Sequence, residues 1–367
     1  MSNKRILIFS LAYHPMIGGA EIAVKEITNR IPDIDFDMVT LRFDKTHKKR
    51  EKIGNVNVYR IGGGLGYLSK ILFIPQVFFF ALRKNYDLYW AMMTYMLFPV
   101  VLLRLFGKKT SYALTLQDGD PFTHVFNRLR IFVFKPLLLY GFRNASKVQV
   151  ISNFLAQWAR QMGYKREVEV IPNGVDLDRF KNNESRIMNK DRITLITISR
   201  LVRKNRVEDI IRAMKFLPDS IKLTIIGSGH LEAELKLKTK RLKLEARIDF
   251  LGEVPNSDIS PYLNKADIFV RPSLSEGQGI SFIEAMAAGL PVIATPVGGI
   301  PDFLKDGETG LFCEVNNPKS IAEQVERLIA DEPLRNKLIA NAKKMVEEKY
   351  DWNLIARDMK SKVFDKV

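Results

Sequence analysis

The sequence predicts an α/β protein made of two Rossmann-like domains, each with a parallel sheet covered by helices. Short apolar strands alternate with helical segments along most of the 367 residues. The apolar residues of these strands are consecutive, which is typical of strands that are buried on both faces. The alternation stops in a polar stretch near the middle of the chain and then begins again, which indicates two domains.

The first half of the chain contains the elements of one complete domain. We expect strands at residues 5–10, 36–41, 56–61, 87–92, 110–116, 147–151 and 168–171. We expect helices at residues 19–30, 94–106, 122–142 and 153–162. The apolar run at 6–13 superficially resembles a signal peptide, but His14, Pro15 and a Gly-Gly pair follow it. A buried first strand that ends in a glycine turn is therefore the expectation.

The pattern begins again after residues 173–190, a polar run that we interpret as a linker with little to bury. We expect strands at residues 193–199, 222–226, 248–251, 268–271 and 292–294. We expect helices at residues 207–216, 230–242, 259–265 and 280–288. The predicted domains are residues 1–175 and 176–350. A ligand site is expected between them, at the carboxyl ends of the strands.

The chain is strongly basic, and the excess charge is concentrated in its first half. The formal net charge is +16, from 57 Lys and Arg against 41 Asp and Glu. Residues 1–175 carry 25 of the basic and 12 of the acidic residues, a net charge of +13. This half should attract an anionic surface such as acidic lipid, nucleic acid or a phosphorylated acceptor. A solvated charged face that only favours solubility explains the charge equally well.

We expect no disulfide, no metal site and no membrane span from the sequence. Cys313 is the single cysteine, so no disulfide can form within the chain, as is typical of a reducing compartment. The four histidines have no metal-ligand spacing, so no metal is expected. Apolar stretches at 71–82 and 88–103 are shorter than the ~20 residues of a spanning helix. We expect them to be buried or interfacial, and we expect the protein to be cytoplasmic.

The strongest indication of chemistry lies at residues 273–284, between a predicted strand and a predicted helix. Gly277 and Gly279 let backbone amides approach an anion, and a helix N-terminus adds partial positive charge. Glu276 stands at the loop entrance, where it could meet sugar hydroxyls. Glu284 stands one turn into the helix, where it could accept hydrogen bonds from a ribose. An ordinary turn with two incidental acidic residues is the alternative.

A second candidate segment, residues 199–205, follows the first strand of the second domain. Arg200 can bind a diphosphate through its forked guanidinium, and Lys204 adds a point charge. Such cations stabilise the negative charge that builds on a departing nucleoside diphosphate. Gly18 and Gly19 open a helix after the first strand and form another anion-compatible turn. Their spacing is not Gly-x-Gly-x-x-Gly, so a nicotinamide-dinucleotide site is not indicated.

These segments, taken in order, resemble glycosyltransferase family 4, whose members have the GT-B fold of two Rossmann-like domains that face an interdomain cleft. The matching motifs are Gly-Gly-Ala-Glu (18–21), Ile-Pro-Asn-Gly-Val-Asp (171–176), Ser-Arg-Leu with a later Lys (199–204), Ile-Gly-Ser-Gly (226–229), Phe-Leu-Gly (250–252), the Glu-x7-Glu pair at 276 and 284, Ala-Met-Ala-Ala-Gly-Leu-Pro-Val-Ile-Ala (285–294) and Asp-Gly-Glu-Thr-Gly (306–310). The resemblance is nearly continuous from residue 171 onward and sparse before it.

The resemblance implies a retaining, hexosyltransferase-type enzyme that moves a sugar from a nucleotide-diphosphate sugar to an acceptor hydroxyl. Such enzymes usually need no metal, and many act in the synthesis of cell-surface glycans, polysaccharides or glycolipids. Glu276, Arg200 and Lys204 are the implied catalytic residues on the donor side. The implied donor-binding residues are Gly18, Gly19, Arg200, Lys204, Gly277, Gln278, Gly279, Ile280 and Glu284. The first domain would bind the acceptor, and a final helix at about 351–367 would return to complete it.

The sequence departs from the family pattern at several positions. Members often have an aromatic residue where this chain has Gln278, and a Gly where it has Asn205. They also commonly carry a His after the strand that ends here at Leu116. Candidates by position for the acceptor-side catalytic group are Gln117, Asp118, Asp120 and His124. A turn or helix cap formed by the two aspartates is an equally good interpretation.

Residues 67–84 and 128–143 interleave aromatic and basic side chains. Both could be amphipathic helices that lie on an anionic membrane and lead to a lipid-linked acceptor, or core helices with solvated ends. Two other functions stay open, a GT-B nucleotide-sugar epimerase and a non-catalytic, basic nucleic-acid-binding protein. The Arg-Lys pair followed by Glu-x7-Glu favours the transferase. Nucleic acid is disfavoured because no RNA-binding signature or zinc motif occurs.

Overall fold

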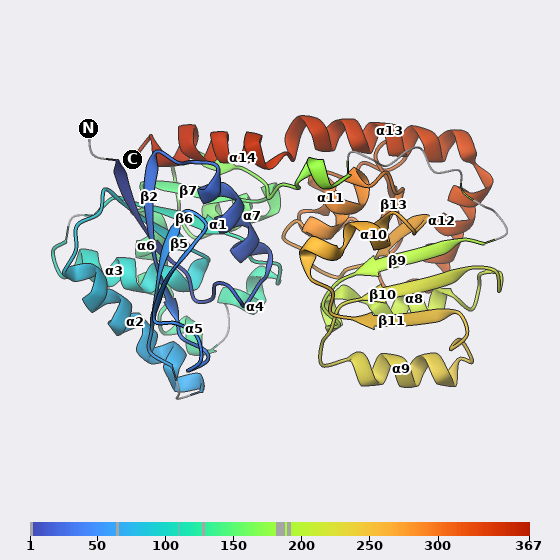
Figure 1. The fold of residues 1–367 in the computed structure, drawn as a ribbon, viewed down its shortest axis with the longest axis horizontal. Helices are drawn as coiled ribbons and strands as arrows, with labels where there is room; N and C mark the ends of the chain where they lie inside the picture. The colour runs from blue at the N-terminus through green and yellow to red at the C-terminus, as the bar shows by residue number, and fades with distance from the viewer. Residues whose placement is uncertain (1–2, 64–65, 109, 127–128, 181–187, 189–191) are drawn as a thin grey trace. The chain divides into compact units, whose positions relative to one another are not determined.

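The computed structural model describes residues 1–367 apart from 1–2, 64–65, 109, 127–128, 181–187 and 189–191. The chain divides into two compact units (Figure 1). Unit 1 consists of Met1–Asn173 together with Trp352–Val367, and unit 2 consists of Gly174–Asp351. Each unit has its own sheet and its own hydrophobic core, so each is described separately.

Unit 1 is built on a sheet with the strand order β3-β4-β2-β1-β5-β6-β7-β8. The strands are β1 (Lys4–Phe9), β2 (Ile34–Leu41), β3 (Arg50–Ile53), β4 (Val56–Ile61), β5 (Leu88–Met92), β6 (Tyr112–Leu116), β7 (Lys147–Val150) and β8 (Val168–Val170). The chain first builds outward from β1 to one edge and then returns to β5 and builds to the other edge. The carboxyl ends of β1 and β5 therefore form the topological switch point, where open α/β sheets bind ligands.

The central strand β1 shows why the helices of unit 1 form two layers. Successive side chains of a strand point to opposite faces of the sheet. Ile6 and Ile8 pack with α1 (Gly19–Asn29) and the C-terminal segment, whereas Leu7 and Phe9 pack with the helices of the other face. The helices of that other layer include α2 (Tyr67–Leu82), α3 (Leu97–Leu105), α6 (Lys135–Arg143) and α7 (Asn153–Gln161), with η1 (Thr94–Met96) before α3.

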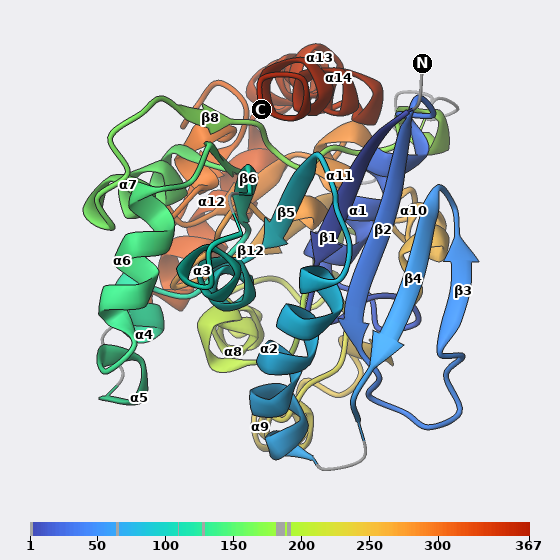
Figure 2. The ribbon, with the colours of Figure 1, turned by 90° about the vertical axis from the view of Figure 1, so that its left-hand side faces the viewer.

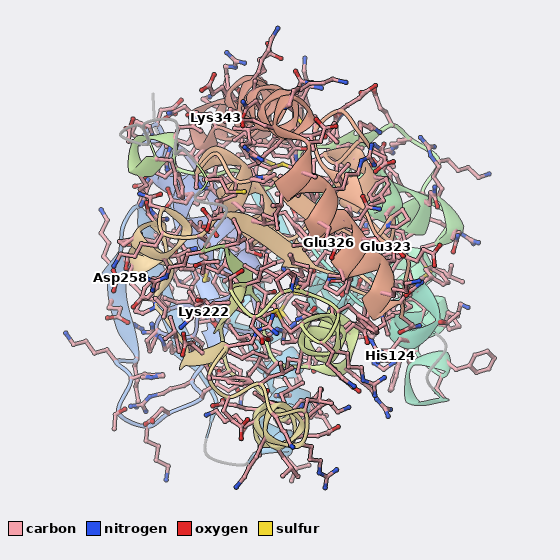
Figure 3. All side chains as sticks on the ribbon, turned by 90° about the vertical axis from the view of Figure 1, so that its right-hand side faces the viewer. His124, Lys222, Asp258, Glu323, Glu326 and Lys343 are labelled. Carbon is pink, nitrogen blue, oxygen red and sulfur yellow. The ribbon has the colours of Figure 1, made fainter. Side chains whose placement is uncertain are left out.

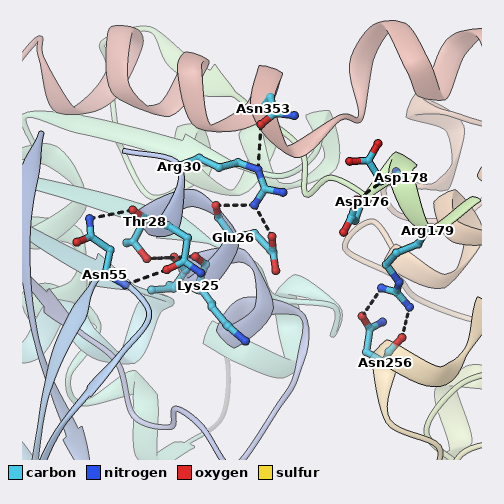
Figure 4. Close-up of polar contacts among 12 residues, drawn as sticks. Lys25, Glu26, Thr28, Arg30, Asn55, Asp176, Asp178, Arg179, Asn256 and Asn353 are labelled. Carbon is cyan, nitrogen blue, oxygen red and sulfur yellow. Dashed lines mark hydrogen bonds and ion pairs between the residues drawn. The ribbon is translucent and has the colours of Figure 1, made fainter. Parts of the chain in front are cut away.

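The C-terminal segment belongs to the core of unit 1. It comprises α14 (Trp352–Asp358) and the π-helical turn η6 (Met359–Phe364). Phe364 is fully buried, and its ring lies 4.9 Å from that of Trp90 on β5 and 5.9 Å from that of Phe36 on β2. Arg30, at the end of α1, donates a 3.2 Å hydrogen bond to Asn353 (Figure 4). The last residues of the chain thus complete a domain that begins with the first ones.

Unit 2 contains a parallel sheet with the strand order β11-β10-β9-β12-β13-β14. Its strands are β9 (Thr194–Ile198), β10 (Lys222–Ile226), β11 (Ile248–Gly252), β12 (Ile268–Arg271), β13 (Val292–Ala294) and β14 (Leu311–Phe312). Its helices are α8 (Val207–Ala213), α9 (Glu232–Arg241), α10 (Ser260–Leu263), α11 (Ile280–Ala287), α12 (Pro318–Ala330) and α13 (Glu332–Lys349), with short turns η2 (Leu177–Phe180), η3 (Arg203–Asn205), η4 (Asn256–Asp258) and η5 (Ile300–Asp302). The switch point of this sheet lies between β9 and β12.

Two predictions about the chain's organisation are wrong. The expected helix over 122–142 is interrupted between α5 (Leu129–Phe132) and α6, because Pro136 has no amide hydrogen to continue a helix from Phe132. Its first part is α4 (Phe122–Phe126), and residues 127–128 lie outside the described residues. The linker at 173–190 was expected to bury little, yet Val175 and Phe180 are buried in the core of unit 2. Residues 181–187 and 189–190 of that stretch lie outside the described residues.

Among the described residues, every helix is too short or too polar to cross a membrane.

Removing the Phe364 ring should destabilise unit 1. We expect Phe364→Ala to lower the free energy of unfolding by roughly 3–5 kcal/mol, because the substitution leaves a cavity between the sheet and η6. All three tryptophans of the chain, Trp90, Trp158 and Trp352, lie in unit 1, so their fluorescence in a urea titration follows this unit. Phe132→Ala is the control, because that ring is exposed and its loss should change the unfolding free energy by less than ~0.5 kcal/mol. Equal midpoints for the two variants would contradict this role of η6.

Candidate active site

The switch point of unit 2 brings together the two segments that the sequence analysis singled out. Residues 199–206 follow β9, and residues 272–279 follow β12, the strand beside it. Since both strands are parallel, both loops leave the same edge of the sheet. The Leu274 amide donates a 2.6 Å hydrogen bond to the Lys204 carbonyl, so the backbones of the two loops are in direct contact.

Arg271, the last residue of β12, ties these loops together beneath the surface. Its guanidinium donates to Ser281 on α11 at 2.9 Å, to Asn205 at 3.3 Å and to the Glu276 carboxylate. Asn205 in turn donates a 2.7 Å bond to the Arg200 carbonyl. Both side chains of the Arg271–Glu276 ion pair are about nine-tenths buried. Loss of one member of such a pair leaves an uncompensated buried charge, which costs ~3–5 kcal/mol.

Glu276 has a fixed orientation in this network. One carboxylate oxygen accepts from Arg271, and the other accepts from the Gly277 amide at 3.1 Å. The Glu276 carbonyl accepts from the Gly299 amide at 2.9 Å, and it lies only 2.0 Å from where a Cβ on Gly298 would stand. A glycine is therefore required at 298, which also has a left-handed φ of 58°. The surrounding backbone holds Glu276 at the carboxyl end of β12.

The loop after β12 has the backbone geometry of an anion-binding turn. Gly279 has a left-handed φ of 82° and is the residue before the first turn of α11. The first amides of a helix have no partner within the helix, and they carry the positive end of its dipole. Gly277 and Gln278 are buried within this turn, whereas Ile280 is half-buried at the start of α11. The hydroxyl oxygens of Ser199 and Ser273 are buried and have no hydrogen-bond partner in the described part of the chain, which is typical of positions completed by water or a ligand.

The basic residues of the β9 loop have different exposures. Arg200 is exposed, and Lys204 is half-buried in η3. Because Asn205 fixes the Arg200 carbonyl and Leu274 fixes the Lys204 carbonyl, both cations extend from a backbone that is bonded to the β12 loop. The structure therefore places Arg200 and Lys204 in the loop next to Glu276 and the turn at 277–279.

Glu284 lies in a second polar cluster of unit 2. Its carboxylate is buried and accepts a 2.7 Å hydrogen bond from Asn256 on η4. Arg179 donates a 3.0 Å bond to the Asn256 side chain and a further bond to its backbone carbonyl (Figure 4). Burial raises the pKa of Glu284, and the Asn256 hydrogen bond and the Arg179 charge lower it by smaller amounts. Asn256 and Arg179 therefore do not fully offset the desolvation of the ionised carboxylate. A ligand that donates a hydrogen bond to Glu284 would supply the missing stabilisation.

Sequence reasoning missed Arg271, Asn256 and Arg179. Arg271 carried a signal, since it is the one charged residue of the apolar strand segment 268–271. An arginine in a strand that is buried on both faces needs acidic or amide partners close by. Asn256 and Arg179 carried no such signal. Asn256 is separated in the chain by 28 residues from Glu284 and by 77 residues from Arg179, so no local pattern indicated these contacts.

The switch point of unit 1 contains a cavity of about 300 Å³. It lies at the carboxyl ends of β1, β5 and β6, and most of its lining is apolar. The lining residues are Ser10, Leu11, Ala12, Ala20, Glu21, Met92, Met93, Thr94, Tyr95, Met96, Phe98, Asp118, Val125, Ile131 and Leu138. Met93 has a φ of 66°, which is strained for a non-glycine residue and is typical of functional sites.

The structure separates the acceptor-side candidates. Asp118 lines the cavity. Gln117 forms two hydrogen bonds with Asn173, at 3.1 and 3.0 Å, and is not among the cavity-lining residues. His124 lies on α4 with its side chain at the surface and is not among the lining residues (Figure 3). The Asp118 and Asp120 spacing is also common in metal sites, but no group of three or more potential metal ligands occurs among the described residues.

The glycine turn after β1 is partly occupied by the protein itself. Gly18 precedes α1, and its amide donates a 2.8 Å hydrogen bond to the Glu21 carboxylate in a capping box. Both Gly18 and Gly19 are exposed. An anion at this turn would meet the Glu21 carboxylate, so the turn after β12 is the better anion site.

Comparison with known proteins assigns both halves of the chain to glycosyltransferases. Residues 17–179 match the model described as Glycosyltransferase Family 4, and residues 178–345 match Glycosyl transferases group 1. The chain is 34% identical to the uncharacterized glycosyltransferase MJ1607 of Methanocaldococcus jannaschii over 52% of each protein. It is 28% identical to MJ1178 of the same organism over 96% of this chain and 95% of that protein.

Other relatives have more informative names. The capsular polysaccharide biosynthesis glycosyltransferase CapM of Staphylococcus aureus is 31% identical over 52% of each protein. The matches to MJ1607 and CapM therefore span about half the length of these relatives. Among solved structures, sucrose-phosphate synthase from Thermosynechococcus elongatus gives a TM-score of 0.84 at 21% identity, over 99% of both chains. Anabaena HepE in complex with UDP and glucose gives 0.79 at 21% identity, over 99% of this chain and 100% of that one.

The two α/β units, each with a mostly parallel sheet, have the GT-B fold of these solved structures. The chain belongs to glycosyltransferase family 4, with a group 1 domain in its second half. The fold class and the family predicted from the sequence are thus confirmed.

Replacing Glu284 with Gln should stabilise unit 2 at neutral pH. Burial raises the folded-state pKa of Glu284, so its ionisation opposes folding once the pH exceeds the unfolded-state pKa of about 4.3. We expect the stability gain of Glu284→Gln to be absent near pH 4 and to grow as the pH rises toward 7. Hydrogen exchange of the α11 amides, measured across this range, would report the change. A gain that is the same at every pH would contradict the burial of an under-compensated carboxylate.

Proposed function

We propose that this protein transfers a sugar from a nucleotide-diphosphate sugar to an acceptor hydroxyl with retention of anomeric configuration. The observation that carries the proposal is the Arg271 network, which holds the basic loop 200–204 against the glycine turn 277–279. Together these loops supply two cations and several backbone amides for a diphosphate. The UDP complex of HepE supports a nucleotide donor in a protein of the same fold.

In the proposed mechanism, the bond between the sugar C1 and the diphosphate oxygen lengthens first. Arg200, Lys204 and the amides at 277–280 stabilise the negative charge on the leaving diphosphate. The acceptor oxygen attacks C1 on the same face, and its proton passes to the departing diphosphate oxygen. No metal is needed, because cationic side chains and amides neutralise the charge. NMR of the anomeric proton in the product would test the stereochemistry, and an inverted product would overturn retention.

Two carboxylates have distinct proposed roles in donor recognition. Glu284 accepts hydrogen bonds from the ribose, since it lies buried and Asn256 is its one direct side-chain donor in the described part of the chain. Glu276 contacts the transferred sugar from its fixed position beside the diphosphate turn. A hydrogen bond to a charged group contributes ~1.5–3 kcal/mol, so loss of either carboxylate should reduce kcat/KM by roughly ten- to hundredfold.

The acceptor is proposed to bind in the unit 1 cavity, with Asp118 orienting its hydroxyl. The apolar lining favours an amphiphilic acceptor, such as a lipid-linked glycan, over a free polar sugar. CapM, named for capsular polysaccharide biosynthesis, supports a role in cell-surface glycan assembly. We propose a cytoplasmic location, where nucleotide sugars are available.

Binding of UDP, GDP and ADP to the purified protein tests the donor site. A nucleotide at 100 times its dissociation constant should stabilise the protein by ~2.7 kcal/mol in a thermal unfolding experiment. Arg200→Ala with Lys204→Ala should weaken binding by roughly a hundredfold or more, because two charge-assisted contacts are lost. Lys236→Ala with Lys240→Ala is the matched control, since both are exposed on α9 of the same unit. Stabilisation that survives in the double variant of the β9 loop would overturn the proposed site.

A further inference from the structure

Unit 1 exposes large apolar side chains on three neighbouring segments, and we define these as the apolar face. Its members are Leu68, Ile71, Leu72, Phe79 and Leu82 on α2, Leu105 and Phe106 at the end of α3, and Phe132, Val133 and Phe134 around the start of α6. All ten have at least 40% of their surface exposed. Exposed apolar groups that occur singly are normal, whereas a contiguous set marks an interaction surface.

Contacts between the helices show that the apolar face is continuous. The rings of Phe78 and Phe106 lie 5.2 Å apart and join α2 to the end of α3. The rings of Phe98 and Phe134 lie 5.9 Å apart and join α3 to the start of α6. The Tyr95 hydroxyl donates a 2.6 Å bond to the Lys70 carbonyl of α2. In Figure 2, α2, α3 and α6 cover the same face of the unit 1 sheet.

The α2 helix is apolar on its inner and on its outer side. Phe73, Val77, Phe78 and Ala81 are buried against the sheet, while Ile71 and Phe79 are 51% and 57% exposed. A helix that is apolar all round is normally covered on both sides. With 16 residues, α2 is too short to span a bilayer, which requires ~20 residues. An interfacial position, parallel to the bilayer surface, would cover its outer side.

The charge around the apolar face favours an acidic surface. Residues 62–166 contain 14 Lys and Arg but three acidic residues, Asp87, Asp118 and Asp120. The Asp87 carboxylate accepts a 2.7 Å hydrogen bond from the Arg5 amide, and Asp118 lines the cavity. Arg42 and Lys70 line a depression of about 450 Å³ near the N-terminus of α2. Arg42 donates to two backbone carbonyls, so these contacts do not neutralise its charge.

We infer that the apolar face docks on a membrane whose surface is rich in acidic phospholipid headgroups. Apolar side chains enter the acyl boundary while the surrounding Lys and Arg contact the headgroups. The α5 helix links the apolar face to the cavity of unit 1, because Ile131 on α5 lines the cavity and Phe132, beside it, is exposed. An acceptor carried by a lipid would therefore lie next to its binding site. Docking does not depend on the proposed transfer reaction, so the two can fail separately.

Co-sedimentation with vesicles tests this inference. We expect the protein to bind vesicles of equal parts phosphatidylglycerol and phosphatidylcholine, and not phosphatidylcholine alone. Ile71→Ser, Phe79→Ser and Phe132→Ser together should weaken binding by at least a hundredfold, since each buried large apolar side chain contributes about tenfold. The matched control is Phe216→Ser, Leu237→Ser and Val315→Ser, which removes three exposed apolar residues from unit 2 and should bind as the natural protein does.

Three outcomes would overturn the inference. The first is the absence of binding to acidic vesicles at low salt, and the second is equal loss of binding in the two triple variants. The third is a dimer in analytical ultracentrifugation that the unit 1 triple variant abolishes, because a second copy would then cover the apolar face. Unchanged tryptophan fluorescence would establish that the unit 1 variant is folded.

Discussion

Arg271 is buried at the end of a strand, and a buried guanidinium must be bonded on several sides or its desolvation destabilises the fold. Asn205, Glu276 and Ser281 bond its two terminal nitrogens, whereas its Nε is buried without a hydrogen-bond partner among the described residues. The loop that carries Arg200 and Lys204 is therefore held against the turn that precedes α11. The proposed donor site of unit 2 depends on this constraint, since preorganised cations and amides stabilise a diphosphate without reorganising.

The two units use the same topology for different chemistry. In unit 2 the switch point is polar, with an ion pair, buried hydroxyls and the Glu284 cluster. In unit 1 it is a mostly apolar cavity with Asp118 in its lining, and the helices beside it expose an apolar and basic face. This asymmetry matches the polar, charged donor and the amphiphilic acceptor proposed above. The excess of basic residues lies in the first half of the sequence, which forms most of unit 1 and its apolar and basic face.

Much of the fold followed from local sequence patterns. The predicted bounds are correct for the strands 56–61, 222–226, 268–271 and 292–294. Apolar residues between turn signals define where these buried strands begin and end. The antiparallel edge strand β3 (Arg50–Ile53) was missed, since its charged residues carry no apolar signal. The break before α6 was missed because the apolar periodicity of residues 122–142 continues through Pro136. The loops with Arg200, Lys204, Glu276 and Glu284 were identified from sequence, but their connection through Arg271 and Asn256 required the three-dimensional structure.

Backbone hydrogen exchange with and without saturating nucleotide locates the bound ligand on the chain and so tests the proposed donor site. We expect slower exchange at 199–206 and 273–284 in the presence of the nucleotide that binds. We also expect Arg200→Ala with Lys204→Ala to abolish this protection. Saturated binding that leaves both segments unprotected, or protection confined to the unit 1 cavity, would contradict a donor site at the switch point between β9 and β12.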